Sequence, residues 1–280
     1  MSTPGGPRGT WARLRGDPLA LAALAVLALV ALAAACGPWF AAASAGVMHL
    51  RQRDLGPGPG HWFGTDALGR NLGLRLCLGG RVSLLIGAAA VAVDLAVGAA
   101  WGALAAWSGG WGDTLLMRGV DLLYSVPYLL LAMVLLLLLG RGLATIVLAI
   151  AVVNWLGMAR LVRGQVLALR QAPFVLAARA SGAPGVYVLR RHLLPNLRAP
   201  VLAWLSFSLP QAIFAEAYLS YLGLGVQPPN TSWGTMVAQG AAELPAHAWQ
   251  FVLPSSVLCL TLACCFLVGD ALRRATDPRG

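Results

Sequence analysis

The stretch LAARASGAPGVYVLRRHLLPN, residues 176–196, interrupts a chain that is otherwise strongly apolar. It contains three arginines together with glycine and proline, and it lies between two long apolar runs. A segment of this composition is too polar to cross a bilayer, which requires about 20 predominantly apolar residues. The stretch is therefore expected to lie outside the membrane and to separate two groups of membrane helices.

The positions of proline and glycine predict two short helices in this region. Pro173 suits the first turn of a helix because its missing N–H has no role there. Gly182 is expected to close a helix over residues 174–181 in the left-handed conformation. A second short helix is predicted over residues 186–194, ended by Pro195 and Asn196.

The composition of the whole chain indicates a polytopic membrane protein. Of its 280 residues, 59% are hydrophobic and 11% are charged, against about 25% charged residues in soluble domains. The formal net charge is +10, and all 20 basic residues are arginine. Because membrane proteins concentrate basic residues in cytoplasmic loops, we attribute this excess to topology rather than to nucleic-acid binding.

Six membrane crossings are predicted, which makes the fold all-α with about six transmembrane helices. An even number of crossings places both termini on one side, and the arginines near both ends indicate the cytoplasm. The chain then divides into an amphipathic cytoplasmic tail (1–17), a transmembrane domain (18–268) and a C-terminal cytoplasmic tail (269–280). The predicted crossings are residues 18–40, 82–107, 115–139, 144–158, 201–222 and 251–268.

The charges of the connecting loops support this topology, with one exception. Residues 159–199 hold seven arginines and no acidic residue, whereas residues 223–250 hold no arginine and only Glu243. The first loop is therefore predicted to be cytoplasmic and the second external. The connection 41–81 should also be external, although it carries five arginines, namely Arg51, Arg53, Arg70, Arg75 and Arg81.

An apolar strip is predicted on the second short helix of the 159–199 loop. Val186, Leu189 and Leu193 recur there at helical spacing, beside Arg190 and Arg191. An exposed strip of this kind has to be covered. Lipid headgroups can cover a basic amphipathic helix, and so can a groove on a partner protein. The residues themselves leave both alternatives open.

The opening stretch resembles the signature loop of binding-protein-dependent ABC importer permeases. In that family the loop reads Glu-Ala-Ala, three residues, Gly, nine residues, an aliphatic position, any residue, Leu and Pro. Leu176 stands at the Glu position and His192 at the aliphatic one, which are departures from the pattern. The residues in register are Ala177, Ala178, Gly182, Leu194 and Pro195.

The resemblance implies that this loop supplies a coupling helix that docks into a separate ATPase subunit. Leu176 puts one polar contact to the ATPase in doubt, but an exposed ion pair contributes only about 0–1 kcal/mol, so docking by apolar contact can persist. The expected coupling residues are Leu176, Ala177, Ala178, Arg179, Gly182, Arg190, Arg191, Leu194 and Pro195.

Three further stretches resemble the second permease subunit of dipeptide, oligopeptide and nickel importers. They are HWFGTDALGRNLGLRLCLGGRVSLLIG (61–87), EAYLSYLGLGVQPPNTSWGTMVAQG (216–240) and LVGDALRRATDPR (267–279). The resemblance implies a bacterial inner-membrane assembly with a homologous permease, two ATPase subunits and an extracytoplasmic substrate-binding protein. Short peptides are the expected cargo, and nickel or another small solute is the alternative.

No enzymatic site is expected in this chain. A phosphate-binding loop of the form G-x-x-x-x-G-K-[ST] needs a lysine, and the sequence contains none. ATP and Mg²⁺ are therefore expected on the partner ATPase, with no cofactor or metal site here, since the histidines show no metal-ligand spacing. A secondary transporter driven by an ion gradient is the alternative from another class, and it predicts broken helices and an internal repeat.

Two acidic residues, Asp94 and Glu216, fall inside predicted crossings. A charged aspartate at mid-bilayer costs about 2.5–3.5 kcal/mol on insertion scales, so neither side chain should face lipid. Either the two residues line a polar translocation path, or they pair with neighbouring helices. Asp121, near the start of the third crossing, is expected at the membrane interface beside Arg118.

Overall fold

The computed structural model describes residues 15–41 and 48–276, and every regular element in these ranges is helical. The predicted all-α fold is therefore confirmed for this part of the chain. Two π-helical turns, η2 and η3, join successive α-helices without a break. The elements are α2 (Pro18–Ala41), the 3₁₀ turn η1 (Leu50–Gln52), α3 (Leu72–Val93), η2 (Asp94–Gly98), α4 (Ala99–Ser108), α5 (Gly110–Ser125), α6 (Tyr128–Leu139), α7 (Leu143–Arg170), α8 (Pro173–Ala180), α9 (Gly185–Val188), η3 (Leu189–Leu193), α10 (Leu194–Tyr221), α11 (Trp233–Glu243) and α12 (Trp249–Thr276).

Several of these helices are long and apolar enough to cross a membrane. A further crossing results if α5 and α6, which meet at an angle of 87°, form one broken span. The fifth predicted crossing, 201–222, falls largely in α10, which is 28 residues long but less apolar than the others. Among the described residues, four segments are long enough and apolar enough to cross a membrane without a second helix. They are Pro18–Gly37, Leu72–Ser108, Leu143–Arg170 and Trp249–Ala275.

The predicted crossing 115–139 is not one continuous helix. α5 ends at Ser125 and α6 begins at Tyr128, with Val126 extended and Pro127 at the start of α6. Proline has no N–H to donate to the preceding turn, and it restrains the residue before it to extended conformations. The helix is therefore broken at this point, and its two halves run in different directions.

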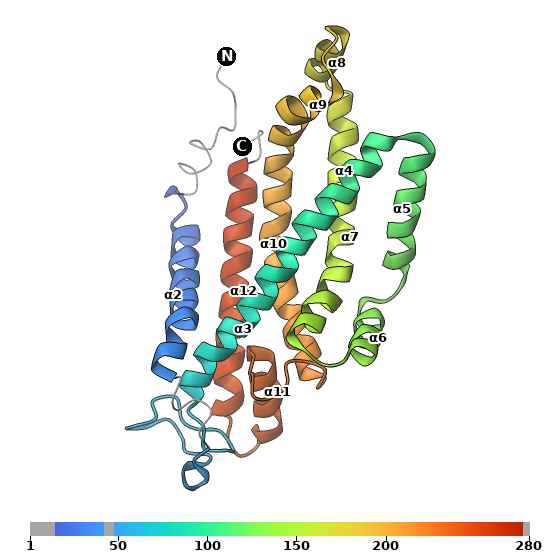
Figure 1. Ribbon diagram of the computed structural model, residues 1–280. Helices are drawn as coiled ribbons and strands as arrows, with labels where there is room; N and C mark the ends of the chain where they lie inside the picture. The colour runs from blue at the N-terminus through green and yellow to red at the C-terminus, as the bar shows by residue number, and fades with distance from the viewer. Residues whose placement is uncertain (1–14, 42–47, 277–280) are drawn as a thin grey trace.

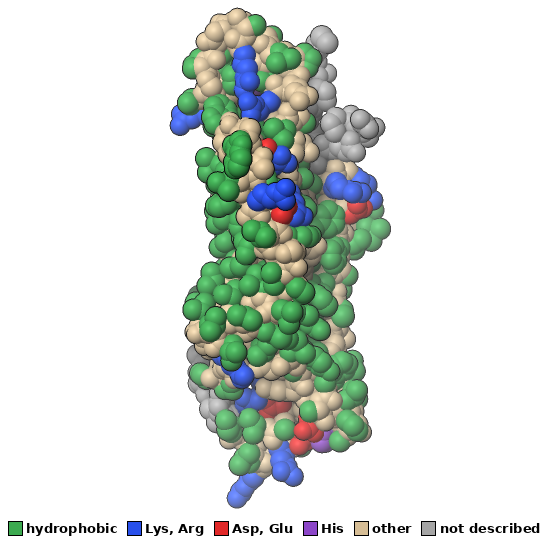
Figure 2. All heavy atoms as spheres, turned by 90° about the vertical axis from the view of Figure 1, so that its right-hand side faces the viewer, with side chains coloured by type: hydrophobic (Ala, Val, Ile, Leu, Met, Phe, Trp, Pro, Cys, Tyr) green, Lys and Arg blue, Asp and Glu red, His purple; other side chains and the backbone are tan. Residues whose placement is uncertain are grey.

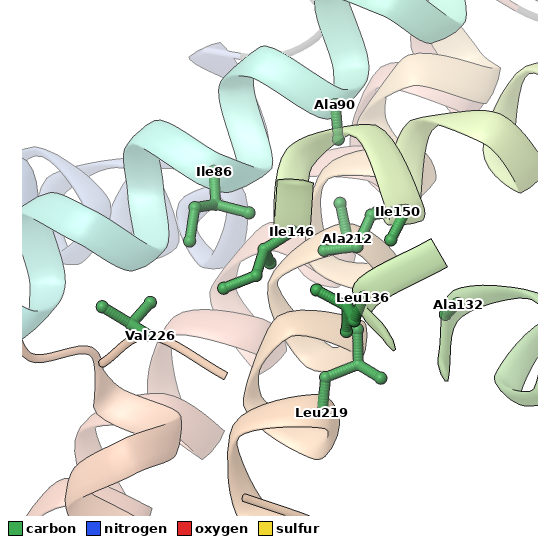
Figure 3. Close-up of a cluster of buried hydrophobic side chains, with 10 residues drawn as sticks. Ile86, Ala90, Ala132, Leu136, Ile146, Ile150, Ala212, Leu219 and Val226 are labelled. Atoms are coloured by element: carbon green, nitrogen blue, oxygen red, sulfur yellow. The ribbon is translucent and has the colours of Figure 1, made fainter. Parts of the chain in front are cut away.

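The helices pack around a shared apolar core. α2, α12, α10 and α7 lie side by side, and the continuous helix α3–η2–α4 crosses them obliquely (Figure 1). Alanines in this core let α7 approach α3, α6 and α10 closely (Figure 3). The buried members of this cluster are Ile86, Ala90, Ala132, Leu136, Ile146, Ala149, Ile150, Ala212, Leu219 and Val226.

Two glycines bring the last part of α3–η2–α4 against α7. A side-chain carbon at Gly98 would meet the side chain of Met158, and one at Gly102 would meet the carbonyl oxygen of Ala159. Backbones can come this close only where no side chain separates them. α4 is therefore fixed to the half of α7 that leads to α8.

The described ends of the chain lie together, at the end of the molecule that carries α8 and α9 (Figure 1). Arg274 of α12 donates to Asp17, just before α2, over 3.0 Å. Ala20, Ala271 and Ala275 pack beneath this ion pair. The segment 48–71 and α11 lie at the opposite end (Figure 1).

A buried ionic cluster organises that opposite end. Asp66 accepts from Arg70 at 2.7 Å and from Arg75 at 2.6 Å, and the Arg75 side chain is only 4% exposed. Arg75 also donates to Thr231 and Gln239, which lie beside and within α11. Two of the arginines that seemed out of place in the 41–81 connection are therefore paired within the chain, through one shared carboxylate.

Candidate functional site

The predicted helix in the opening stretch is present as α8, and it ends as expected. Gly182 has φ +78°, in the left-handed region. Its N–H donates to Arg179 over 3.0 Å, and the N–H of Ala183 donates to Ala178 over 3.0 Å. This pair of bonds is the Schellman motif, which satisfies the last carbonyls of a helix and usually requires glycine at this position.

The second short helix does not end at Pro195 and Asn196, so that prediction was wrong. α9, η3 and α10 form one uninterrupted helix from Gly185 to Tyr221. In the π turn the N–H of Leu194 donates to Leu189, five residues back. The turn accommodates an extra residue immediately before Pro195, where a regular α-helix would be interrupted by the missing N–H.

The π turn also changes which side chains are buried. The predicted strip of Val186, Leu189 and Leu193 is not the buried face, because Val186 is 61% exposed. Val188, Leu193 and Leu197 are buried instead. The interval of five residues between Val188 and Leu193 reflects the residue that the π turn adds.

The α8–α9 segment is anchored firmly to the helix bundle. Val175 of α8 and Val188 of α9 are fully buried in a cluster with Val162 and Val166 of α7. Arg170, at the end of α7, donates to the carbonyl oxygen of Ala106 in α4. The segment therefore forms a single packed unit with α4 and the end of α7.

The outer side of this segment is an exposed surface that is both apolar and basic. The exposed fractions of Leu176, Tyr187 and Leu194 are 52%, 50% and 47%. The His192 ring lies between Phe174 and Tyr187, with ring centroids 5.8 and 5.9 Å away. We call this surface the terminal face; it comprises Phe174, Leu176, Ala177, Arg179, Gly182, Val186, Tyr187, Arg190, Arg191, Leu194 and Pro195.

Eight of the nine predicted coupling residues belong to the terminal face, and Ala178 lies half-buried beside it. Arg179, Arg190 and Arg191 form no ion pair with any of the described residues, so the basic charge of the surface is not neutralised within the chain. Such a surface can bind an apolar groove rimmed with acidic groups.

The two acidic residues of the predicted path lie in the interior of the chain. Asp94 is fully buried and accepts from Ser208 at 2.5 Å and from the Trp204 indole at 3.3 Å. Both donors belong to α10, whereas Asp94 begins the π turn after α3. In this conformation Asp94 therefore pairs one helix with another, and its role in a path stays a prediction.

Glu216 of α10 makes a similar link to α3, farther along the contact between these two helices. It is fully buried and accepts from Ser83 at 2.9 Å and from Ser220 at 2.7 Å. The Ser83 hydroxyl in turn accepts from the N–H of Trp233 at the start of α11, over 3.2 Å. Glu216 thus connects α10 to α3 and α11, and a path role stays a prediction here too.

Two groups of charged side chains were not foreseen from the sequence. Asp121 pairs with Arg160 of α7 at 2.8 Å, rather than with its neighbour Arg118. Ligand-type atoms of Asp54, Glu243 and His247 lie within 4.8 Å of one another. Asp121 is far from Arg160 in the sequence, and Asp54 is far from Glu243 and His247, so spacing alone could not indicate either group.

Comparison with known proteins gives a consistent assignment. Residues 98–279 match the family described as binding-protein-dependent transport system inner membrane component. Residues 8–57 match the N-terminal transmembrane domain of oligopeptide transport permease C.

Individual relatives match over nearly the whole chain. The oligopeptide transport system permease protein OppC of Bacillus subtilis (strain 168) is 40% identical over 267 residues, which cover 95% of this chain and 88% of the relative. The dipeptide transport system permease protein DppC of the same organism is 40% identical, with 96% and 84% covered. OppC of Escherichia coli (strain K12) is 37% identical, with 95% and 89% covered.

A solved structure shares the fold. A chain of the MetNI methionine ABC transporter in an inward-facing conformation superposes with a TM-score of 0.60, covering 72% of this chain and 96% of that chain at 19% identity. The terminal face, the helical architecture and these matches agree. The chain belongs to the family of binding-protein-dependent transport system inner membrane components.

Proposed function

We propose that this chain is a permease subunit of an ATP-driven importer of short peptides in the bacterial inner membrane. The observation that carries the proposal is the terminal face, where the family's signature positions lie together and exposed at one end of the molecule. Relatives that match over nearly the whole chain are oligopeptide and dipeptide transport permeases, which supports a peptide as cargo.

The topology we propose has six crossings with both termini in the cytoplasm. α10 serves as the sixth crossing beside the four apolar segments and the broken α5–α6 pair. The proximity of Asp17 to Arg274 supports an even number, because the described ends lie together. The arginines of the terminal face place that end in the cytoplasm by the distribution of basic residues.

In this proposal the terminal face couples ATP hydrolysis on a partner subunit to movement of the membrane helices. α8 and α9 enter a groove on a partner ATPase, which binds ATP and Mg²⁺, and Leu176 provides an apolar contact where the family carries glutamate. Fully burying a leucine side chain stabilises a contact by about 1.5–3 kcal/mol, more than an exposed ion pair does. The complete assembly contains a homologous permease, two ATPase subunits and an extracytoplasmic binding protein.

Reconstitution tests this function directly. The chain, co-expressed with the permease, ATPase and binding-protein chains of its own importer, is placed in proteoliposomes, and uptake of a labelled dipeptide is measured with and without ATP. ATP-dependent uptake that disappears when this chain is omitted supports the proposal. Uptake that persists in its absence, or that follows an ion gradient without ATP, contradicts it.

A pair of leucine variants tests the docking surface. Leu176→Ser should reduce co-purification of the ATPase subunits with this chain. Leu244→Ser is the matched control, because Leu244 is 43% exposed against 52% for Leu176 and lies after α11, at the opposite end of the molecule. Equal retention of the ATPase by both variants would remove Leu176 from the interface.

A further inference from the structure

A polar cavity opens on the outer side of α5 and α7, beside the half of α7 that leads to α8. Its volume is about 550 Å³. Figure 2 looks onto this side of the molecule and shows arginine and acidic side chains gathered above a surface that is almost entirely hydrophobic. The lining residues are Thr114, Met117, Arg118, Asp121, Arg160 and Arg163.

The charged groups of this cavity differ in how completely they are paired. Arg163 donates from two nitrogens to both carboxylate oxygens of Asp113, at 2.6 and 2.7 Å, so this pair is closed. Asp121 accepts from Arg160 through one oxygen only, and the two side chains are 55% and 39% exposed. Arg118 is exposed and forms no ion pair with any described residue. Arg118 and one oxygen of Asp121 therefore remain available to a ligand.

The surroundings of the cavity indicate water rather than lipid. Charged side chains inside membrane segments almost always face the bundle interior or a water-filled cavity. The break between α5 and α6 follows directly after Tyr124, whose ring lies 4.0 Å from the guanidinium carbon of Arg160. Non-helical backbone at membrane depth is tolerated only within protein or along an aqueous cavity. Two independent features thus point to the same aqueous surface.

We propose that this cavity is a peptide-binding subsite on the translocation path, where Arg118 binds the carboxylate terminus and Asp121 the ammonium terminus. The assignment rests on the proposed transport function. Arg118 and Asp121 lie one turn apart on α5, with about 5–6 Å between their Cβ atoms. The charged ends of an extended dipeptide are roughly 7 Å apart, within reach of the long arginine side chain.

Recognition of the two termini has a chemical advantage for a peptide carrier. Every unblocked peptide has these charges, whatever its side chains, and guanidinium pairs with carboxylate through two parallel hydrogen bonds. The subsite would therefore accept many sequences while rejecting peptides whose ends are blocked. It also places the substrate beside α7, the helix that leads to the terminal face.

Cysteine accessibility in the assembled transporter tests the subsite. Thr114→Cys lines the cavity, whereas its neighbour Leu115→Cys is 67% exposed but does not line it. A membrane-impermeant thiol reagent should label position 114 and not position 115, measured above the labelling of the parent chain. Saturating dialanine should slow labelling at position 114 at least about fivefold, and N-acetyl-dialanine amide should not. Absence of this difference would overturn the assignment.

Charge variants then test the two roles. Arg118→Gln should weaken protection by dialanine about tenfold, which corresponds to about 1.4 kcal/mol. Arg141→Gln, an exposed arginine between α6 and α7 that does not line the cavity, should leave protection unchanged. Asp121→Asn should remove the difference in protection of position 114 between peptides with a free amine and peptides with a blocked amine.

The possible outcomes separate the subsite from the proposed function. If the wild-type assembly imports dialanine but position 114 is not protected, the function stands and the subsite fails. If position 114 is not labelled either with or without dipeptide, another protein covers the cavity. This result also refutes the subsite. If the wild-type assembly imports no peptide, the function fails and the subsite with it.

Discussion

Adding one methyl group at Gly182 should weaken the coupling of ATP hydrolysis to transport while leaving the rest of the protein intact. A Cβ at this position would meet nothing within 4 Å, so the change introduces no steric clash. The φ of +78° is the source of the penalty, because a residue with a side chain loses roughly 1–2 kcal/mol in the left-handed region. This energy is small beside the stability of a domain, at about 5–15 kcal/mol, so the effect should stay local.

The local effect concerns the end of α8. If Gly182 leaves the left-handed region, the hydrogen bonds to Arg179 and Ala178 are lost together, each contributing about 0.5–1.5 kcal/mol. The orientation of α8 relative to α9 is then no longer fixed. Coupling of ATP hydrolysis to transport should therefore fall progressively in the variants Gly182→Asn, Gly182→Ala and Gly182→Val. Asparagine tolerates the left-handed conformation, whereas a β-branched residue does not.

The assay is the ratio of dipeptide imported to ATP hydrolysed in proteoliposomes. Gly164→Ala is the matched control, because Gly164 also has open space around it but lies within the regular helix α7. There the added methyl should stabilise the helix by about 0.5–1 kcal/mol and leave the ratio unchanged. A wild-type ratio in fully assembled Gly182→Val would refute the reasoning, and so would an equal loss in Gly164→Ala.

Two further substitutions test the packing on which the fold depends. Arg75→Met should lower the free energy of unfolding by about 1.5–3 kcal/mol, because Asp66 keeps Arg70 but loses the buried hydrogen bond from Arg75; chemical denaturation in detergent should show this loss, and the exposed Arg81→Met should change little. Gly102→Leu should separate α4 from α7 and reduce the yield of folded protein measured by size-exclusion chromatography, whereas Gly119→Leu, where a Cβ meets nothing within 4 Å, should retain the wild-type yield.

The local signals of the sequence were reliable where one residue type decides the conformation. Gly182 and Pro173 mark the two ends of α8 because each is suited to one backbone geometry that few other residues adopt. The same reasoning failed at Pro195, which a π turn incorporates into a continuous helix. Whether proline ends a helix depends on the hydrogen bonding of the turn before it, which can be an α turn or a π turn. The pattern of residue types does not show which of the two forms.

The candidate site could be located from the sequence but its partners could not. The coupling residues fall within one 20-residue segment, 176–195, so their common position at one end of the molecule follows from the chain itself. The pairs Asp121–Arg160 and Asp113–Arg163 join α5 to α7, and only the crossing of these helices brings them together. Buried carboxylates such as Glu216 were recognised as requiring partners, but Ser83 as its partner depends on tertiary packing.

The uninterrupted helix from Gly185 to Tyr221 has a mechanical consequence. At about 1.5 Å per residue its length is roughly 55 Å, so a tilt of about 10° imposed at one end displaces the other by roughly 10 Å. Pro200 and Pro210 lie within it without ending it. In the proposed assembly, a movement that the ATPase imposes at the terminal face would therefore shift the opposite part of this helix, where Glu216 lies.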